Sequence, residues 1–162
     1  LSLINNRGLF INGLIKRQLR IGNYGIADLV SFEFGYSSPI YDGQEFYKYR
    51  DFPTEYIKQF RPSIRITIYE LKKDKIGISA FLQSVRYTTG IKQFIENKYP
   101  NSDFYFIVNI VLIGSELDTS GSLCFIPDVF PNVSFYTYKY DLDGIVFNSE
   151  EDYKLINEGF KL

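Results

Sequence analysis

The chain of 162 residues contains no histidine. Imidazole is the proton acceptor of Ser-His-Asp and Cys-His sites and a common zinc ligand, so these catalytic sites and His-ligated zinc are excluded. Nucleases that activate water with an imidazole are excluded for the same reason. Any chemistry must therefore use carboxylates, lysine, tyrosine or the peptide backbone.

Methionine is also absent, and cysteine occurs once. Cys124 is the single cysteine, so no internal disulfide can form. The N-terminal stretch also lacks the charged-then-apolar order of a secretory signal, and the two features together favour a cytoplasmic protein. Because methionine is absent, we expect that the sequence does not begin at the natural start. Apolar runs stay below the length of about 18 residues that a membrane span requires, so we expect no membrane segment.

Acidic residues are missing from the first part of the chain. Residues 1–27 contain Arg7, Lys16, Arg17 and Arg20 and no acid, although the formal net charge of the whole chain is only -1. We therefore expect this part to face phosphates. Arg17 and Arg20 are candidate nucleic-acid contacts, although arginines on exposed strand positions also serve solubility.

The pattern of apolar residues predicts a single domain over residues 1–162, built on a mixed β-sheet flanked by helices. The order of elements is typical of an α/β or α+β fold. Strands are predicted at 14–22, 26–34, 64–72, 104–114, 133–140 and 144–148, with a turn at 23–25, a helix over 79–98 capped by Ser79, and a final helix after Ser149.

Residues 36–62 interrupt this pattern and are interpreted as an insertion. They contain three prolines and many aromatic residues, with a short helix expected at 54–60. Aromatic rings interleaved with lysine and arginine can stack bases and contact phosphates. Alternatively, the rings form a small core of their own or a contact between subunits, which makes a homodimer possible.

Two predicted strands carry acidic residues on faces that are otherwise apolar. Asp28 shares a face with the apolar residues at 26, 30, 32 and 34, and Glu70 and Lys72 continue the face of the isoleucines at 66 and 68. A buried unpaired carboxylate is costly, so such positions indicate a paired group, a strand end or a bound cation. If the two strands are neighbours, Asp28 and Glu70 can bracket one Mg²⁺, and Lys72 can reach a phosphate or a metal-bound water.

These residues resemble a known motif. Asp28, then Glu70-Leu71-Lys72, then Gln83 and Tyr87 four residues apart in the following helix are similar to the PD-(D/E)xK phosphodiesterase superfamily, in its RecB-like branch with a QxxxY helix. The resemblance covers about residues 25–99. It implies a restriction-endonuclease-like fold and cleavage of nucleic acid, DNA more than RNA, with Mg²⁺ or Mn²⁺.

The resemblance also implies a role for each matching residue. Asp28 and Glu70 become metal ligands together with the Leu71 carbonyl, and Lys72 positions the attacking water and stabilises developing charge. Gln83 and Tyr87 line the site and touch the nucleic-acid backbone. Arg86 lies beside them on the same helix and adds a guanidinium to this surface.

The chain departs from the superfamily pattern in two places. Ala27 stands where the motif name has proline. Members often supply a further carboxylate from an upstream helix, and no acid precedes Asp28 here. Either that acid lies in a missing N-terminal part or the site has a reduced ligand set. The alternatives to a nuclease are a non-catalytic module of the same fold, which binds nucleic acid or supports assembly, and a structural protein without this ancestry.

Overall fold

The computed structural model describes residues 7–37, 46–48, 60–118 and 122–150. The helices expected at 54–60 and after Ser149 lie outside these ranges, as does most of the insertion. The side chain of Cys124 is also outside the description. Among the described residues, no helix is both long and apolar enough to cross a membrane.

The first two strands form the predicted hairpin. Strand β1 (Leu14–Ile21) pairs antiparallel with β2 (Gly25–Ser37). The connection is tight, because the Tyr24 N–H donates to the Ile21 carbonyl at 2.8 Å. Gly25 has a φ of +125°, a conformation that side chains with a Cβ rarely adopt. The turn predicted at 23–25 is thus confirmed, and glycine is what makes it possible.

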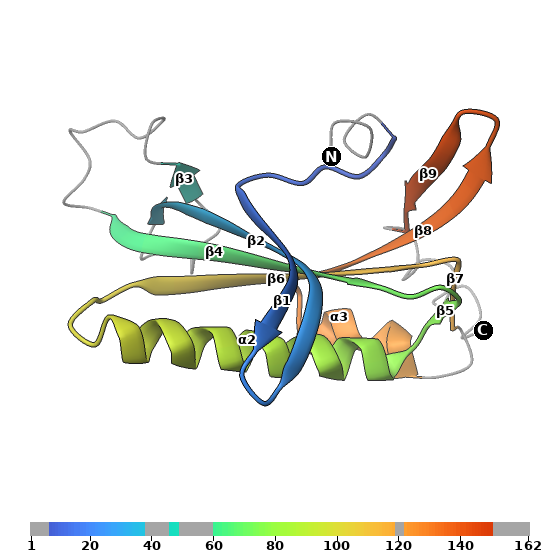
Figure 1. Ribbon diagram of the computed structural model, residues 1–162. Helices are drawn as coiled ribbons and strands as arrows, with labels where there is room; N and C mark the ends of the chain where they lie inside the picture. Colours follow the sequence, from blue (N-terminus) through green and yellow to red (C-terminus); the bar gives the residue numbers. More distant parts are fainter. Residues whose placement is uncertain (1–6, 38–45, 49–59, 119–121, 151–162) are drawn as a thin grey trace. The chain divides into compact units, whose positions relative to one another are not determined.

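One mixed sheet organises the chain, in the strand order β1-β2-β4-β6-β8-β9 with β3 paired to β2 (Figure 1). Pairing is antiparallel for β1/β2 and β8/β9 and parallel for β6/β8. The mixed α+β architecture predicted from the sequence is therefore confirmed. The further strands are β3 (Phe46–Lys48), β4 (Arg61–Leu71), β6 (Tyr105–Gly114), β8 (Val133–Asp141) and β9 (Gly144–Ser149).

The long helix α2 (Ile78–Lys98) follows β4, as predicted. It begins one residue before Ser79, so Ser79 lies in the first turn and is not the cap. The other described elements are the two-stranded parallel sheet of β5 (Lys75–Ile76) and β7 (Glu116–Leu117), the 3₁₀ helix η3 (Ser122–Phe125) and the short helix α3 (Ile126–Val129).

Helix α2 leaves several of its large apolar side chains exposed, namely Ile78, Leu82 and Phe94. The buried positions are Ala80, Ser84, Tyr87, Thr88 and Ile91. Small and hydroxylated side chains bring the helix close to its neighbours, and the Ser84 hydroxyl is satisfied by the Ala80 carbonyl at 2.9 Å.

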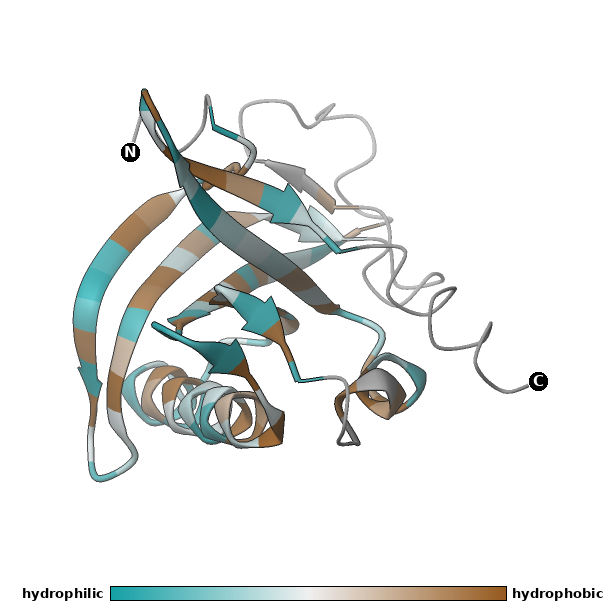
Figure 2. Ribbon diagram, turned by 90° about the vertical axis from the view of Figure 1, so that its right-hand side faces the viewer, coloured by the Kyte–Doolittle hydropathy of each residue, from teal (hydrophilic) through white to brown (hydrophobic). Residues whose placement is uncertain are grey.

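The face of β2 that carries Asp28 is also less buried than predicted. Ile26 and Phe34 are exposed at 48% and 44%, and only Val30 on that face is fully buried. The opposite face holds Ala27, Ser31 and Glu33, all buried. Figure 2 shows hydrophilic and hydrophobic residues alternating along the strands. The expectation that Asp28 interrupts a core face is therefore corrected: it lies half-buried on a partly exposed face.

The described residues fall into two compact units whose relative positions are not determined. Unit 1 takes its residues from the ranges 1–11, 69–85 and 110–162, and unit 2 from 12–68 and 86–109. The core of unit 2 joins the β1–β2 hairpin, β4 and the second half of α2 through Val30, Ile66, Ile68, Tyr87 and Ile91. Strands β4 and β6 and helix α2 each contribute to both units.

Candidate active site

Strand β4 carries Glu70, and Lys72 follows the last residue of this strand; both belong to unit 1. Ile66 and Ile68 are fully buried, and Glu70 continues the same alternation at 3% exposure. The strand ends at Leu71, but the Lys72 N–H still donates to the Ile113 carbonyl of β6 at 2.7 Å. The backbone of Lys72 is thus fixed by the central sheet, while its side chain, 34% exposed, reaches the surface.

The ammonium of Lys72 links three of the predicted site residues. Its Nζ lies 3.1 Å from Oε1 of Glu70 and 3.4 Å from Oε1 of Gln83 on α2. The predicted proximity of Glu70, Lys72 and Gln83 is confirmed. An ammonium group has three N–H donors. These two contacts therefore leave Lys72 able to donate to an oxygen of a substrate.

The electrostatics of this group are demanding. A buried ion pair costs desolvation energy that its own attraction barely repays, so it is weak support for stability alone. Glu70 is almost fully buried, whereas Lys72 is one-third exposed. The arrangement holds a cation at a fixed position next to solvent, which is the property that a site acting on an anionic substrate needs.

Asp28 belongs to unit 2, where it sits beside a backbone irregularity. Its Oδ1 accepts a hydrogen bond from Nε2 of Gln18 at 3.4 Å. Gln18 has a φ of +48°, although the pairing register is the same on both sides of it, with Arg17 opposite Leu29 and Leu19 opposite Ala27. Non-glycine residues with positive φ are strained and cluster at functional sites. The strain opposite Asp28 supports a functional role for this carboxylate.

The predicted pairing of Asp28 with Glu70 stays a prediction, because the two residues belong to different units. Within unit 1, Glu70 and the Leu71 carbonyl offer oxygen ligands. Mg²⁺ is usually held by one or two carboxylates together with waters and phosphate oxygens, so this donor set suits the ion. Among the described residues, no three His, Cys, Asp or Glu side chains form a group that could hold a metal by themselves.

Tyr87 has a different environment from the one that the resemblance implies. Its side chain is buried at 1% exposure, and its hydroxyl donates to the Ile26 carbonyl at 2.9 Å. The ring also packs on Gly25, where an added Cβ would come within 3.1 Å of Cε1. The expected contact of Tyr87 with a nucleic-acid backbone is therefore corrected: the residue anchors α2 to the β1–β2 hairpin.

Gly90 reinforces the same anchor. A Cβ at this position would lie 2.5 Å from Cγ2 of Ile21 and 2.7 Å from Cδ2 of Tyr24. The helix therefore meets the hairpin at a glycine, where a side chain would overlap with Ile21 and Tyr24. The hairpin and the helix lie side by side in Figures 1 and 2.

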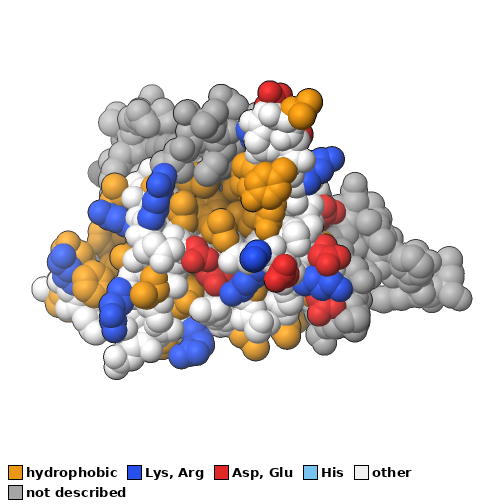
Figure 3. Space-filling view, turned by 45° about the vertical axis from the view of Figure 1, so that its right-hand side comes forward, with side chains coloured by type: hydrophobic (Ala, Val, Ile, Leu, Met, Phe, Trp, Pro, Cys, Tyr) orange, Lys and Arg blue, Asp and Glu red, His pale blue; other side chains and the backbone are white. Residues whose placement is uncertain are grey.

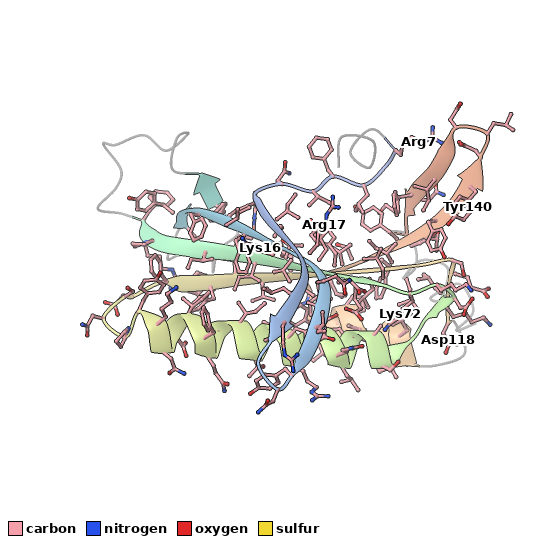
Figure 4. The ribbon with its side chains drawn as sticks, viewed as in Figure 1. Arg7, Lys16, Arg17, Lys72, Asp118 and Tyr140 are labelled. Carbon is pink, nitrogen blue, oxygen red and sulfur yellow. The ribbon has the colours of Figure 1, made fainter. Side chains whose placement is uncertain are left out.

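The predicted basic contacts are accessible. Arg17 and Arg20 on β1 and Arg86 on α2 are all exposed, and all belong to unit 2. Figure 4 labels Arg17 together with Lys16, which is also exposed. These side chains remain candidates for phosphate contacts.

Asp118 is an acidic residue of unit 1 that sequence reasoning missed. It follows β7, and its N–H donates to the Ile76 carbonyl of β5 at 2.9 Å. Figure 4 labels Asp118 and Lys72 on the right-hand side of the view, near the start of α2. The only signal in the sequence was an acid after a short apolar stretch, which is too common to single it out.

Comparisons with models of known protein families, with curated proteins and with solved structures found no match. The function of the chain is therefore inferred from its own side chains. The grouping of Glu70, Lys72 and Gln83 is the most specific of these features, because the three residues come from two elements and meet at one ammonium.

Proposed function

We propose that the chain is a divalent-metal-dependent nuclease of the PD-(D/E)xK superfamily with a restriction-endonuclease-like fold. The mixed sheet supports this proposal, as does the helix that follows the strand of Glu70 and Lys72. The observation that carries it is the Lys72 ammonium, held between the Glu70 carboxylate and the Gln83 amide. DNA is the expected substrate in preference to RNA.

Lys72 is assigned the central role in the reaction. Its ammonium donates to a non-bridging phosphate oxygen or to the attacking water, and it stabilises negative charge that develops on the phosphate. A fixed position matters, because a preorganised donor needs no rearrangement during the reaction. The Glu70 and Gln83 oxygens provide this positioning by holding Nζ from two sides.

Glu70 and the Leu71 carbonyl are the proposed metal ligands in unit 1, and Asp28 is the expected further carboxylate. When bound, Mg²⁺ or Mn²⁺ neutralises phosphate charge and lowers the pKa of a coordinated water. Gln83 acts as a positioning residue, since its amide oxygen contacts Lys72. The exposed Arg17, Arg20 and Arg86 are proposed to contact the nucleic-acid backbone.

Lys72→Ala tests this assignment against a matched control. Lys75 lies three residues further along the chain, and among the described residues it forms an exposed ion pair with Glu116 at 3.9 Å. We expect Lys72→Ala to lower Mg²⁺-dependent DNA cleavage by about 100-fold or more, because removal of one preorganised charge-stabilising donor has that effect. Lys75→Ala should cleave like the wild type, because exposed ion pairs contribute little.

Gel analysis of labelled DNA measures cleavage, and circular dichroism verifies that both variants are folded. Equal cleavage by Lys72→Ala and Lys75→Ala would remove Lys72 from the mechanism. Nucleic-acid binding by a wild-type protein that cleaves nothing with Mg²⁺ or Mn²⁺ would instead indicate the non-catalytic module.

A further inference from the structure

A hollow of about 280 Å³ opens in unit 1 directly beside Lys72. Figure 3 shows hydrophobic side chains gathered below the tip of the β8–β9 hairpin, with acidic and basic side chains next to them. The residues that line the hollow include Lys72, Lys73, Tyr138, Tyr140, Ile145 and Phe147. None of the described residues that line the hollow is acidic.

The β8–β9 hairpin supplies the aromatic wall of this hollow. Tyr138 pairs with Phe147 and Tyr140 with Ile145, so all four side chains share one face of the hairpin. The rings of Tyr138 and Tyr140 meet edge to face, with centroids 6.0 Å apart. Phe147 is buried, but Tyr140 is 76% exposed. A large aromatic side chain is therefore presented to solvent at the mouth of an apolar hollow.

The wall is attached to the neighbouring backbone. The Tyr138 hydroxyl donates to the Lys73 carbonyl at 2.6 Å, which joins β8 to the segment after Lys72. Arg7 secures the other strand, because its Nε donates to the Ile145 carbonyl at 3.1 Å and its carbonyl accepts from the Phe147 N–H at 2.8 Å. A preformed wall loses little conformational entropy on binding.

Arg7 also offsets the charge of Asp141, one of the two aspartates at the tip of the hairpin. Its guanidinium forms an ion pair with Asp141, and this hydrogen bond holds the pKa of Asp141 below its ordinary value. The hollow itself is bordered by the ammonium groups of Lys72 and Lys73. Positive charge beside an exposed aromatic surface is the combination that single-stranded nucleic acids bind.

We propose that this hollow receives an unpaired nucleobase of the substrate strand, next to the phosphate that Lys72 contacts. The volume is slightly below the range of about 300–1,000 Å³ that drug-sized ligands occupy, so it suits one planar ring system. A base held in a continuous duplex cannot enter such a hollow without leaving its stack. The preferred substrate is therefore a single strand or an unpaired end.

This inference rests on the proposed nuclease function, but its test does not need cleavage. Binding is measured in EDTA by fluorescence anisotropy, with a labelled single-stranded DNA, an RNA of the same sequence and a blunt DNA duplex. The control variant is Tyr99→Ala, which removes another exposed tyrosine, 50% exposed, from the end of α2 in unit 2.

We expect Tyr140→Ala to weaken binding of the single-stranded DNA by about tenfold, because stacking of one base on an aromatic ring is worth that much or more. Tyr140→Phe should retain the affinity, since it keeps the ring, and Tyr99→Ala should bind like the wild type. An RNA strand that binds as tightly and loses the same factor would identify the nucleobase, and not the sugar, as the recognised group.

A second readout detects the base itself. A 2-aminopurine placed in the single strand loses fluorescence when it stacks on an aromatic ring, and Tyr140→Ala should restore that fluorescence. The inference is overturned if Tyr140→Ala binds the single strand like the wild type, or if the duplex binds more tightly and depends equally on Tyr140. Failure of the nuclease proposal looks different, because binding then persists while Mg²⁺ produces no cleavage.

Discussion

Glu70 and Lys72 are alternate residues on one face of the same stretch of chain, but only the side chain of Glu70 belongs to the core. Both residues continue the face of Ile66 and Ile68, yet Glu70 is buried and Lys72 is one-third exposed. The alternation of a strand was enough to predict that their side chains lie together. The contact of Gln83 with Lys72 depends on how α2 packs after β4. The QxxxY resemblance implied that Gln83 lines the site.

Gly8 lies against the backbone of β9. A Cβ at Gly8 would lie 2.1 Å from the Phe147 carbonyl oxygen, and the residue has a φ of +102°. Gly144 has a similar φ of +123°, with nothing within 4 Å of a Cβ. Comparing substitutions at the two glycines therefore separates the energetic cost of backbone strain from that of steric overlap.

Gly144→Ala should lower the free energy of unfolding by about 1 to 2 kcal/mol, the cost of a left-handed conformation. Gly8→Ala should cost more, by about 1 to 3 kcal/mol beyond that, because the clash is with backbone that cannot rotate away. Urea unfolding at equilibrium measures both. Equal effects of the two substitutions would contradict the close approach of Gly8 to β9.

At the scale of elements, the burial of α2 was harder to predict than its position. Ile78, Leu82, Ile91 and Phe94 are large apolar residues of the helix, and of these four only Ile91 is buried. The reason is that Ala80, Ser84 and Thr88 are small enough for close packing, whereas hydrophobic periodicity counts only large side chains. The existence of the helix and its C-terminal end were predictable, because Tyr99-Pro100 ends it and the strands on either side are strongly apolar.

Tyr87→Phe tests the anchoring role that the structure gives to this helix. The substitution keeps the ring and removes the hydrogen bond to the Ile26 carbonyl, so the free energy of unfolding should fall by about 1 kcal/mol. Leu82→Ala, on the exposed side of α2, should change it by no more than about 0.5 kcal/mol. Thermal and urea unfolding measure both variants.

Tyr87→Phe also distinguishes the two roles considered for Tyr87, the anchoring of α2 and a contact with nucleic acid. Nucleic-acid affinity should be unchanged in Tyr87→Phe, since the hydroxyl is used inside the protein. A loss of affinity without a loss of stability would restore the contact with the nucleic-acid backbone that the resemblance implies.

The β8–β9 hairpin was predictable as a strand pair, but its contribution to a site was not. The tyrosines at 136, 138 and 140 alternate as in any half-buried strand, so the sequence does not distinguish a core face from an exposed aromatic wall. That distinction depends on the parallel pairing of β8 with β6, which brings residues far apart in the sequence together. Asp118 was missed because it follows β7, whose parallel pairing with β5 also joins residues far apart in the sequence.

At the scale of the whole molecule, the chain combines a mixed sheet with elements that serve two compact units. The succession of strands along the chain and the helix after β4 followed from runs of apolar and β-branched residues, so the α+β class was predictable from the sequence, whereas the order of the strands in the sheet was not predicted. The cooperation of Asp28 with Glu70 was accessible only as a hypothesis. Asp28 belongs to unit 2 and Glu70 to unit 1, so their sharing of one metal stays a prediction.

The most direct test of the central claim is the single-turnover rate of DNA cleavage as a function of Mg²⁺ concentration, for the wild type, Glu70→Gln and Asp28→Asn. Glu116→Gln is the control, because Glu116 is exposed and its carboxylate lies 3.9 Å from the ammonium of Lys75, which is exposed too. We predict a rate that saturates with Mg²⁺ for the wild type and Glu116→Gln, and a loss of at least about 100-fold for Glu70→Gln and Asp28→Asn. A wild-type rate that does not respond to Mg²⁺, or a Glu70→Gln variant that cleaves like the wild type, would contradict the proposed metal-dependent nuclease.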